Sequence, residues 1–146
     1  MPNIKQVSGG GNVTYYINEE AGVVVAKINA EKYEPFNVAE SVISKLRKAD
    51  EHNAPYDVFY CGGHGFMLDK SYVGVAKCSP EDKFDLEIGK KIALARAQEK
   101  YHAKLSVSLC NMAIYFREIS DALYRRAQHE GDQRTKYNMA AYAVQG

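Results

Sequence analysis

The stretch YVGVAKCSPEDKFDLEIGKKIALARA, residues 72–97, passes from a strand pattern to a helix pattern. Its first part, Tyr72–Lys77, is rich in β-branched and aromatic residues, which predicts a strand. Near its end, the small residues Gly89, Ala93 and Ala97 recur four positions apart, so they share one face of a helix. Small side chains at this spacing allow a second helix or a strand to pack very close to the helix backbone.

The link between the two patterns contains two candidate helix starts. The first start is Ser79, which is followed by Pro80 and, three residues later, by Asp82. This order predicts an N-cap serine, a proline at the first helical position and an acidic first turn. Asp85 offers a second start a few residues later. We expect a helix from Leu86 to about Lys104.

A second long helix is expected from Leu105 to about Glu130, with Gly131 ending it. Its apolar residues follow the alternating 3-4 spacing of an amphipathic helix: Leu105, Leu109, Met112, Phe116, Ile119 and Leu123. The remaining tail, residues 131–146, is expected to be a separate segment, either a short helix or a strap that lies on a neighbouring subunit.

A β-hairpin is expected upstream, from Val13–Ile17 and Val23–Ile28 around a polar turn. Because Val23, Val24 and Val25 make the second strand apolar on both faces, we expect something to cover both sides of it.

Three further elements are expected between this hairpin and residue 72. Asn37 and Glu40 have capping-box spacing and open a short amphipathic helix that runs to Asp50. Tyr56–Cys61 predicts a third strand. The run Gly62–Gly65 is either a tight turn or a loop whose backbone cradles a phosphate.

The predicted order is therefore β-β-α-β-β followed by two longer helices. This is an α+β domain with one antiparallel β-sheet and helices packed on one of its faces. Residues 12–130 form this single domain, and the polar, glycine-rich residues 1–11 are expected to be a flexible N-terminus.

Composition excludes several classes of function. The 146 residues carry 19 basic and 18 acidic side chains, and a net charge of +1 argues against a binder of long nucleic acid. A signal peptide and an 18-residue apolar run are both missing, so we expect a cytoplasmic protein without a membrane partner. Cys61, Cys78 and Cys110 contain no CxxC pair and are expected to be reduced thiols.

The common catalytic, P-loop and dinucleotide-binding motifs are also missing, and the four histidines match no metal-ligand spacing. We therefore expect a protein that is not an enzyme and that uses neither a cofactor nor a metal.

Charge is unevenly distributed along the chain. Residues 1–75 carry seven basic and nine acidic side chains, whereas residues 76–146 carry twelve basic and nine acidic ones. Five of the six arginines lie in the second half, interleaved with aromatic residues. Arginine suits the bidentate binding of phosphate, and aromatic rings suit the stacking of a planar base. A small ligand with two or three phosphates fits this pattern better than a long polyanion does.

The run Cys78–Asp85, then Gly89 and Ile92–Ala97, is similar to a motif of small phage and prophage proteins, as is the preceding Gly74–Lys77. With the hairpin, it resembles the phage anti-defence sponges that inhibit the Thoeris system. Matches lie mainly within residues 72–97 and extend to residues 12–28 and 72–126. The resemblance implies a small β-sheet with helices and a homo-oligomer, either a dimer or a hexamer. It also implies that a cyclic ADP-ribose isomer, or a cyclic oligonucleotide of CBASS defence, is bound without being cleaved.

The resemblance also implies which residues hold the ligand, namely an aromatic ring for the base and arginines for the phosphates. At the positions of this sequence these are Phe84, Arg96, Arg117 and Arg125, with Asn111 as a partner for base or ribose. Two other functions stay open. One is inhibition of a bacterial defence enzyme through protein contacts, as by an anti-CRISPR or anti-restriction factor. The weaker one is binding of double-stranded RNA.

Overall fold

The chain forms an antiparallel four-stranded sheet and two α-helices, in the order β-β-β-α-β-α. The computed structural model describes residues 4–30, 33–53, 56–59, 65–79 and 81–145. Two compact units make up the chain: unit 1 comprises residues 1–36 and 66–109, and unit 2 comprises residues 37–65 and 110–146. The predicted α+β class with one antiparallel sheet is confirmed, but the order of elements differs.

The sheet of unit 1 has the strand order β1-β2-β3-β4, with every neighbouring pair antiparallel. Its strands are β1 (Lys5–Ser8), β2 (Val13–Asn18), β3 (Val23–Asn29) and β4 (Ser71–Lys77). The hairpin of β2 and β3 and the later strand at β4 are therefore confirmed. The prediction of a flexible N-terminus at residues 1–11 is wrong for Lys5–Ser8, because the backbone of β1 pairs with β2 from Lys5↔Ile17 to Ser8↔Thr14.

Glycines make the two tight turns of the sheet. Gly10 and Gly11, between β1 and β2, have φ angles of 84° and 55°. Gly22, between β2 and β3, has a φ of 64°, and its amide donates to the carbonyl of Glu19. A side chain is strained in this left-handed region, so glycine is the residue that the turns require.

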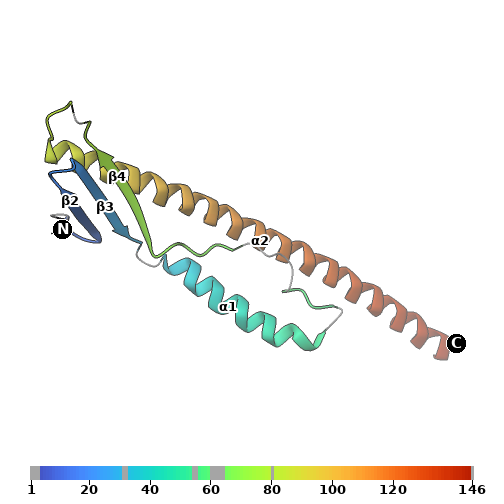
Figure 1. Cartoon of the computed structure of the whole chain (residues 1–146). Coiled ribbons are helices and arrows are strands. Elements are labelled where there is room, and N and C mark those ends of the chain that lie inside the picture. The colour runs from blue at the N-terminus through green and yellow to red at the C-terminus, as the bar shows by residue number, and fades with distance from the viewer. Residues whose placement is uncertain (1–3, 31–32, 54–55, 60–64, 80, 146) are drawn as a thin grey trace. The chain divides into compact units, whose positions relative to one another are not determined.

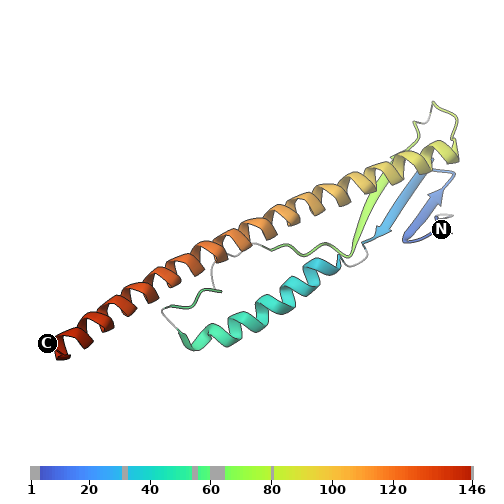
Figure 2. The ribbon, with the colours of Figure 1, turned by 180° about the vertical axis from the view of Figure 1, so that it is seen from behind.

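The second helix, α2 (Leu86–Gln145), covers one face of the sheet with its first turns, as Figures 1 and 2 show from opposite sides. Ala93 and Ala97 of α2 are fully buried together with Val24 and Ala26 of β3. The closest approach is at Gly74 of β4, because a Cβ there would collide with backbone atoms of Ala93 and Ala97. The small-residue spacing thus predicts this packing correctly, and its partner is a strand.

The start and the end of α2 differ from the sequence prediction. Asp85 is the N-cap, because its Oδ1 accepts hydrogen bonds from the amides of Glu87 (3.0 Å) and Ile88 (3.3 Å). Ser79 instead accepts the amide of Asp82 in a turn. The two expected helices are one, and α2 continues through Gly131, whose φ is not positive and so forms no αL cap.

The first helix, α1 (Glu34–Asp50), begins three residues before the predicted cap Asn37. Proline is favoured in the first turn of a helix, where its missing N–H costs nothing, so Pro35 allows the earlier start. A short 3₁₀ helix, η1 (Glu51–Asn53), follows it. The third predicted strand is wrong for residues 56–59, which have no regular structure, and its residues 60 and 61 lie outside the described part.

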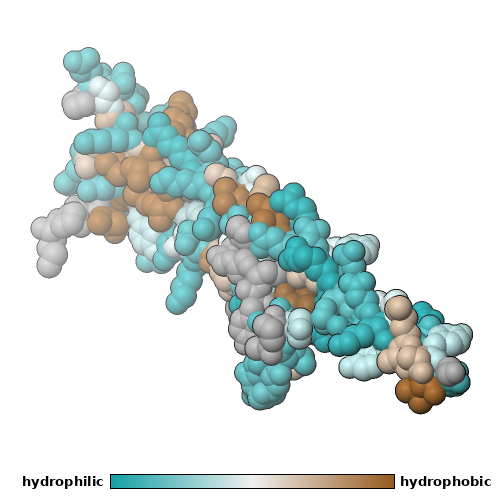
Figure 3. All heavy atoms as spheres, turned by 90° about the vertical axis from the view of Figure 1, so that its right-hand side faces the viewer, coloured by the Kyte–Doolittle hydropathy of each residue, from teal (hydrophilic) through white to brown (hydrophobic). Residues whose placement is uncertain are grey.

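Coverage of apolar side chains is less complete than the sequence predicts. Val24 is fully buried under α2, but Val23 and Val25, on the opposite face of β3, are only half-buried. Apolar residues are also exposed on both helices, and Figure 3 shows brown, hydrophobic residues reaching the surface among hydrophilic ones. In the described part of the chain, no helix has the length and apolarity needed to cross a membrane.

We predict that Gly74→Val lowers the free energy of unfolding by about 3 kcal/mol or more, because backbone atoms of α2 occupy the space that the side chain needs. Gly131→Ala is the matched control, since a Cβ there meets nothing within 4 Å and alanine favours an exposed helix by about 1 kcal/mol. Urea unfolding followed by circular dichroism measures both. Equal stability of Gly74→Val and the unmodified chain would contradict the close packing of α2 on β4.

Candidate functional site

Unit 2 is organised around the backbone of residues 58 and 59, which receives side chains from both helices. The carbonyl oxygen of Phe59 accepts hydrogen bonds from Arg47 Nε of α1 (2.9 Å) and from the Tyr115 hydroxyl of α2 (3.3 Å). The Arg47 guanidinium also lies 5.6 Å from the centre of the Tyr115 ring, within the range of a cation–π interaction. One backbone carbonyl thus joins the two helices.

Asp50, the last residue of α1, binds the backbone amides of the same segment. Its Oδ2 accepts the amides of Val58 (2.5 Å) and Phe59 (3.3 Å), and its Oδ1 accepts Asn53 Nδ2 (2.9 Å). The hydrogen bond from Asn53, the two backbone amides and the charge of Arg126 lower the pKa of Asp50, against a smaller opposing effect of desolvation.

A pocket of about 320 Å³ lies beside this segment, and we call it the Arg125 pocket. Its apolar part comes from Val58 and Ala122, and its polar part comes from arginine, aspartate, tyrosine and histidine side chains. The full lining is Tyr56, Asp57, Val58, Ala122, Arg125, Arg126 and His129. Its volume is at the lower end of the range for small-molecule sites.

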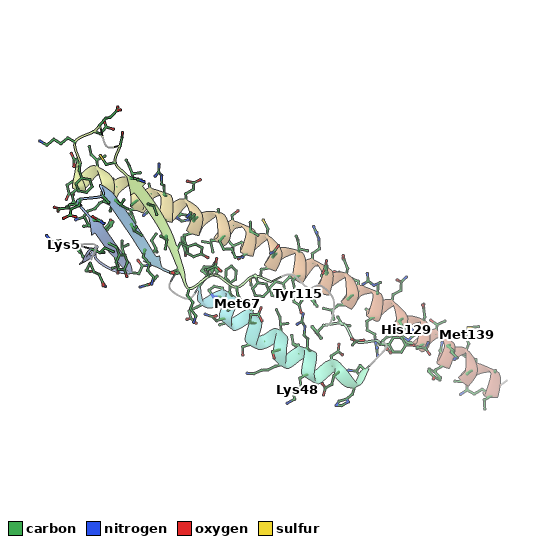
Figure 4. All side chains as sticks on the ribbon, in the orientation of Figure 1. Lys5, Lys48, Met67, Tyr115, His129 and Met139 are labelled. Atoms are coloured by element: carbon green, nitrogen blue, oxygen red, sulfur yellow. The ribbon has the colours of Figure 1, made fainter. Side chains whose placement is uncertain are left out.

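The aromatic and cationic groups of the Arg125 pocket are stacked. The rings of Tyr56 and His129 lie 4.7 Å apart at an interplanar angle of 23°, and the Arg126 guanidinium lies 4.8 Å from the centre of the Tyr56 ring. Arg126 also donates to Glu130 at 2.8 Å. Figure 4 labels Tyr115 and His129, which are fourteen residues apart and project from the same side of α2.

This arrangement fits a small ligand that has a planar ring and a phosphate. Tyr56 is 48% exposed, so part of this aromatic side chain stays accessible to a ligand beside His129 and Arg126. Arg125 is exposed at the pocket, and a guanidinium binds two phosphate oxygens at once. Among the described residues, no group of three or more histidine, cysteine, aspartate or glutamate side chains is placed to hold a metal ion.

The predicted site residues of unit 2 have different positions. Arg125 lines the pocket, as described. Arg117 is exposed on α2 and is not part of the pocket lining. Asn111 donates from Nδ2 to the carbonyl oxygen of Gly65 at 2.8 Å, so its amide joins α2 to the chain after residue 64. Of the Gly62–Gly65 loop, only Gly65 lies within the described residues.

The two predicted site residues of unit 1 both have structural contacts. Phe84 packs against the hydrophobic core of the sheet. Arg96 Nη1 donates to the carbonyl oxygen of Val75 at 2.5 Å, and Lys100 Nζ donates to that of Val73 at 2.8 Å. β4 is an edge strand, and these side chains cover backbone acceptors that would otherwise be open to another strand.

A second pocket, of about 350 Å³, lies in unit 1 and is lined by much of the run 78–92. Phe84, Ile88 and Ile92 give it apolar walls. Lys77 and Lys83 are balanced there by Asp82 and Asp85, the second of which caps α2. Because its charges cancel and it contains no arginine, this pocket suits a phosphate-bearing ligand less well than the Arg125 pocket does.

Sequence reasoning missed Tyr56, Arg126 and His129 as members of a common site. Arg126 and His129 lie three residues apart on α2, a spacing that places them on one helix face, and this was the available signal. No such spacing marks Tyr56, because its position depends on the hydrogen bonds of Asp50 to the backbone of residues 58 and 59.

Comparisons with protein-family models, with curated proteins and with solved structures found no significant match for this chain.

We predict that Asp50→Asn reduces the dependence of stability on pH in acid. A carboxyl whose pKa is lowered by folding contributes stability above its unfolded-state pKa of about 3.9, and this contribution is lost as the pH falls through the folded-state value. The unmodified chain should therefore lose stability below about pH 4 more steeply than Asp50→Asn does. Urea midpoints between pH 3 and pH 7 measure this, with Asp132→Asn as an exposed control. Identical pH profiles for Asp50→Asn and the unmodified chain would argue against the role of Asp50.

Proposed function

We propose that this chain is a phage anti-defence protein that binds and sequesters a cyclic nucleotide signal in the infected cell without cleaving it. The ligand class is a cyclic ADP-ribose isomer or a cyclic oligonucleotide. The observation that carries the proposal is the Arg125 pocket, in which stacked Tyr56 and His129 stand beside Arg125 and Arg126. The resemblance of residues 72–97 to the anti-Thoeris sponges supports the same function.

Sequestration requires affinity and no chemistry. To keep a signal below its activating concentration, the dissociation constant should be near nanomolar, which corresponds to about −12 kcal/mol. Stacking on Tyr56 and charge-assisted hydrogen bonds from two arginines are the kinds of interaction that reach this range in a small pocket. Phe84, Arg96, Asn111 and Arg117, which the resemblance implies, stay candidate ligand residues.

A second function, inhibition of a bacterial defence enzyme through protein contacts, is favoured by one observation. Val38, Val42 and Leu46 of α1 are 58%, 47% and 37% exposed, and they follow one another four residues apart on the helix. Exposed apolar residues on one side of a helix are typical of surfaces that bind another protein.

The test incubates the purified chain with cyclic ADP-ribose isomers and with cyclic di- and trinucleotides, and measures the free nucleotide by liquid chromatography before and after heating. Depletion of one nucleotide, with intact recovery after heating, is the expected result. Arg125→Ala should weaken binding roughly 10- to 100-fold, because a hydrogen bond to a charged group contributes about 1.5–3 kcal/mol. Arg125 is exposed, so this change should leave the fold intact.

Arg134→Ala is the matched control, because Arg134 is an exposed arginine of α2 outside the pocket lining. Arg117→Ala, tested alongside, decides whether the sequence-based assignment of Arg117 holds. A chain that depletes none of the nucleotides would contradict sequestration and favour the protein-contact function. A breakdown product in the supernatant would instead indicate an enzyme.

A further inference from the structure

One side of α2 in unit 2 carries a continuous row of exposed, uncharged side chains. We call this row the α2 seam, and it consists of Ala113, Phe116, Ser120, Leu123 and Ala127. Every member is exposed, and the two large ones, Phe116 and Leu123, are 46% and 47% exposed. The row therefore presents apolar surface that the described residues of the chain leave uncovered.

The spacing of the α2 seam is that of a helix pair. Its members are separated by three, four, three and four residues, the 3.5-residue period that keeps a row facing one partner helix. The side of α2 that packs within unit 2 is a different one, since it contains the buried Tyr115 and Ile119, which are 2% and 7% exposed. The seam is thus available to another molecule.

Large and small residues alternate along the seam, and this alternation indicates the partner. In two parallel copies, Phe116 would face Phe116 in one layer and force the helices apart. Ala113 would face Ala113 in another layer and leave a gap there. In two antiparallel copies centred near residue 118, Phe116 faces the partner's Ser120 and Ala113 faces the partner's Leu123. Every layer then contains one large and one small side chain, which is how close-packed interfaces are filled.

We propose that the α2 seam binds the α2 seam of a second copy of this chain, with the two helices antiparallel and related by a two-fold axis. The same offset puts Leu109, one helical turn earlier on α2, opposite the partner's Ala127. Such an interface is isologous, because each patch is its own complement, and an unrelated partner would not require a pattern with this property. The inference does not depend on the proposed function.

Charges on one flank of the seam agree with the antiparallel arrangement. Arg117 and Asp121 are both exposed and have opposite signs. With the centre near residue 118, Arg117 of one copy lies close to the level of Asp121 of the other, on the same flank of the interface. Opposite charges at an interface rim favour the correct register and the correct partner.

The seam spans fifteen residues, or about 22 Å of helix. A contact along a single helix of this length buries an area at the low end of specific interfaces. We therefore expect a dimer with a dissociation constant in the micromolar range. Sedimentation equilibrium of the full chain between about 1 and 200 μM covers this range and should show a monomer–dimer transition.

The decisive experiment exchanges the sizes of one pair of facing residues. Ala113→Leu puts two leucines in one layer, and Leu123→Ala puts two alanines there, so each should weaken dimerisation at least 10-fold. The double variant Ala113→Leu with Leu123→Ala again has one leucine and one alanine in each such layer. It should dimerise within about three-fold of the unmodified chain.

Val107→Ala is the control, because Val107 is 53% exposed and lies nine residues, or two and a half helical turns, before Phe116 on the opposite side of α2. It should leave dimerisation unchanged. Circular dichroism verifies the helix content of each variant, and Ser120→Glu supplies a second disruptive change if one of the size variants fails to fold. A chain that stays monomeric at 200 μM overturns the proposal. A dimer that ignores Ser120→Glu, or that the double variant does not restore, overturns it as well.

Discussion

Unit 1 depends on one steric constraint, the approach of the α2 backbone to the strand β4 at Gly74. A strand and a helix can come this close only where neither has a side chain of appreciable size, and Gly74, Ala93 and Ala97 meet that condition. Because the helix axis is so near the sheet, long side chains at the edge of α2 reach around β4. Arg96 and Lys100 can then bind the carbonyl oxygens of Val75 and Val73, which protects an edge strand from pairing with other chains. The close packing at Gly74 therefore also places Arg96 and Lys100 where they bind the backbone of β4.

Unit 2 depends on an interaction of another kind, because an extended segment is hydrogen-bonded to both of its helices. Asp50 accepts the amides of residues 58 and 59, while Arg47 and Tyr115 donate to the carbonyl of Phe59. All three partners of this backbone are polar side chains, so they satisfy groups that would be costly to bury unpaired. The same arrangement brings Tyr56 against His129 and Arg126, and it thereby builds the Arg125 pocket.

Local patterns in the sequence predict the elements whose cause is local. The hairpin of β2 and β3, the strand β4 and the small-residue face of α2 follow from alternation, turn residues and four-residue spacing. The predicted break at Gly131 failed because an exposed helix tolerates glycine at a cost of about 1 kcal/mol, so glycine alone does not end it. The strand predicted at residues 56–61 is absent from residues 56–59 for a different reason. Its β-rich residues are held by Asp50 and Arg47, two residues of α1 that no strand pattern includes.

The candidate site shows the same division between local and distant causes. Arg125 could be named because arginine beside aromatic residues suits a phosphate, but Tyr56 comes from about seventy residues earlier in the chain. The apolar pattern of residues 105–123 predicts one amphipathic helix, but α2 buries Ile119 and leaves Leu109, Phe116 and Leu123 partly exposed. Periodicity identifies an apolar face without identifying what covers it. On α2 the pattern is the sum of two adjacent faces, one of which packs within unit 2 while the other has the size alternation of a self-complementary interface. An amphipathic pattern that is too wide for the core it has to cover is itself an indication of a second partner.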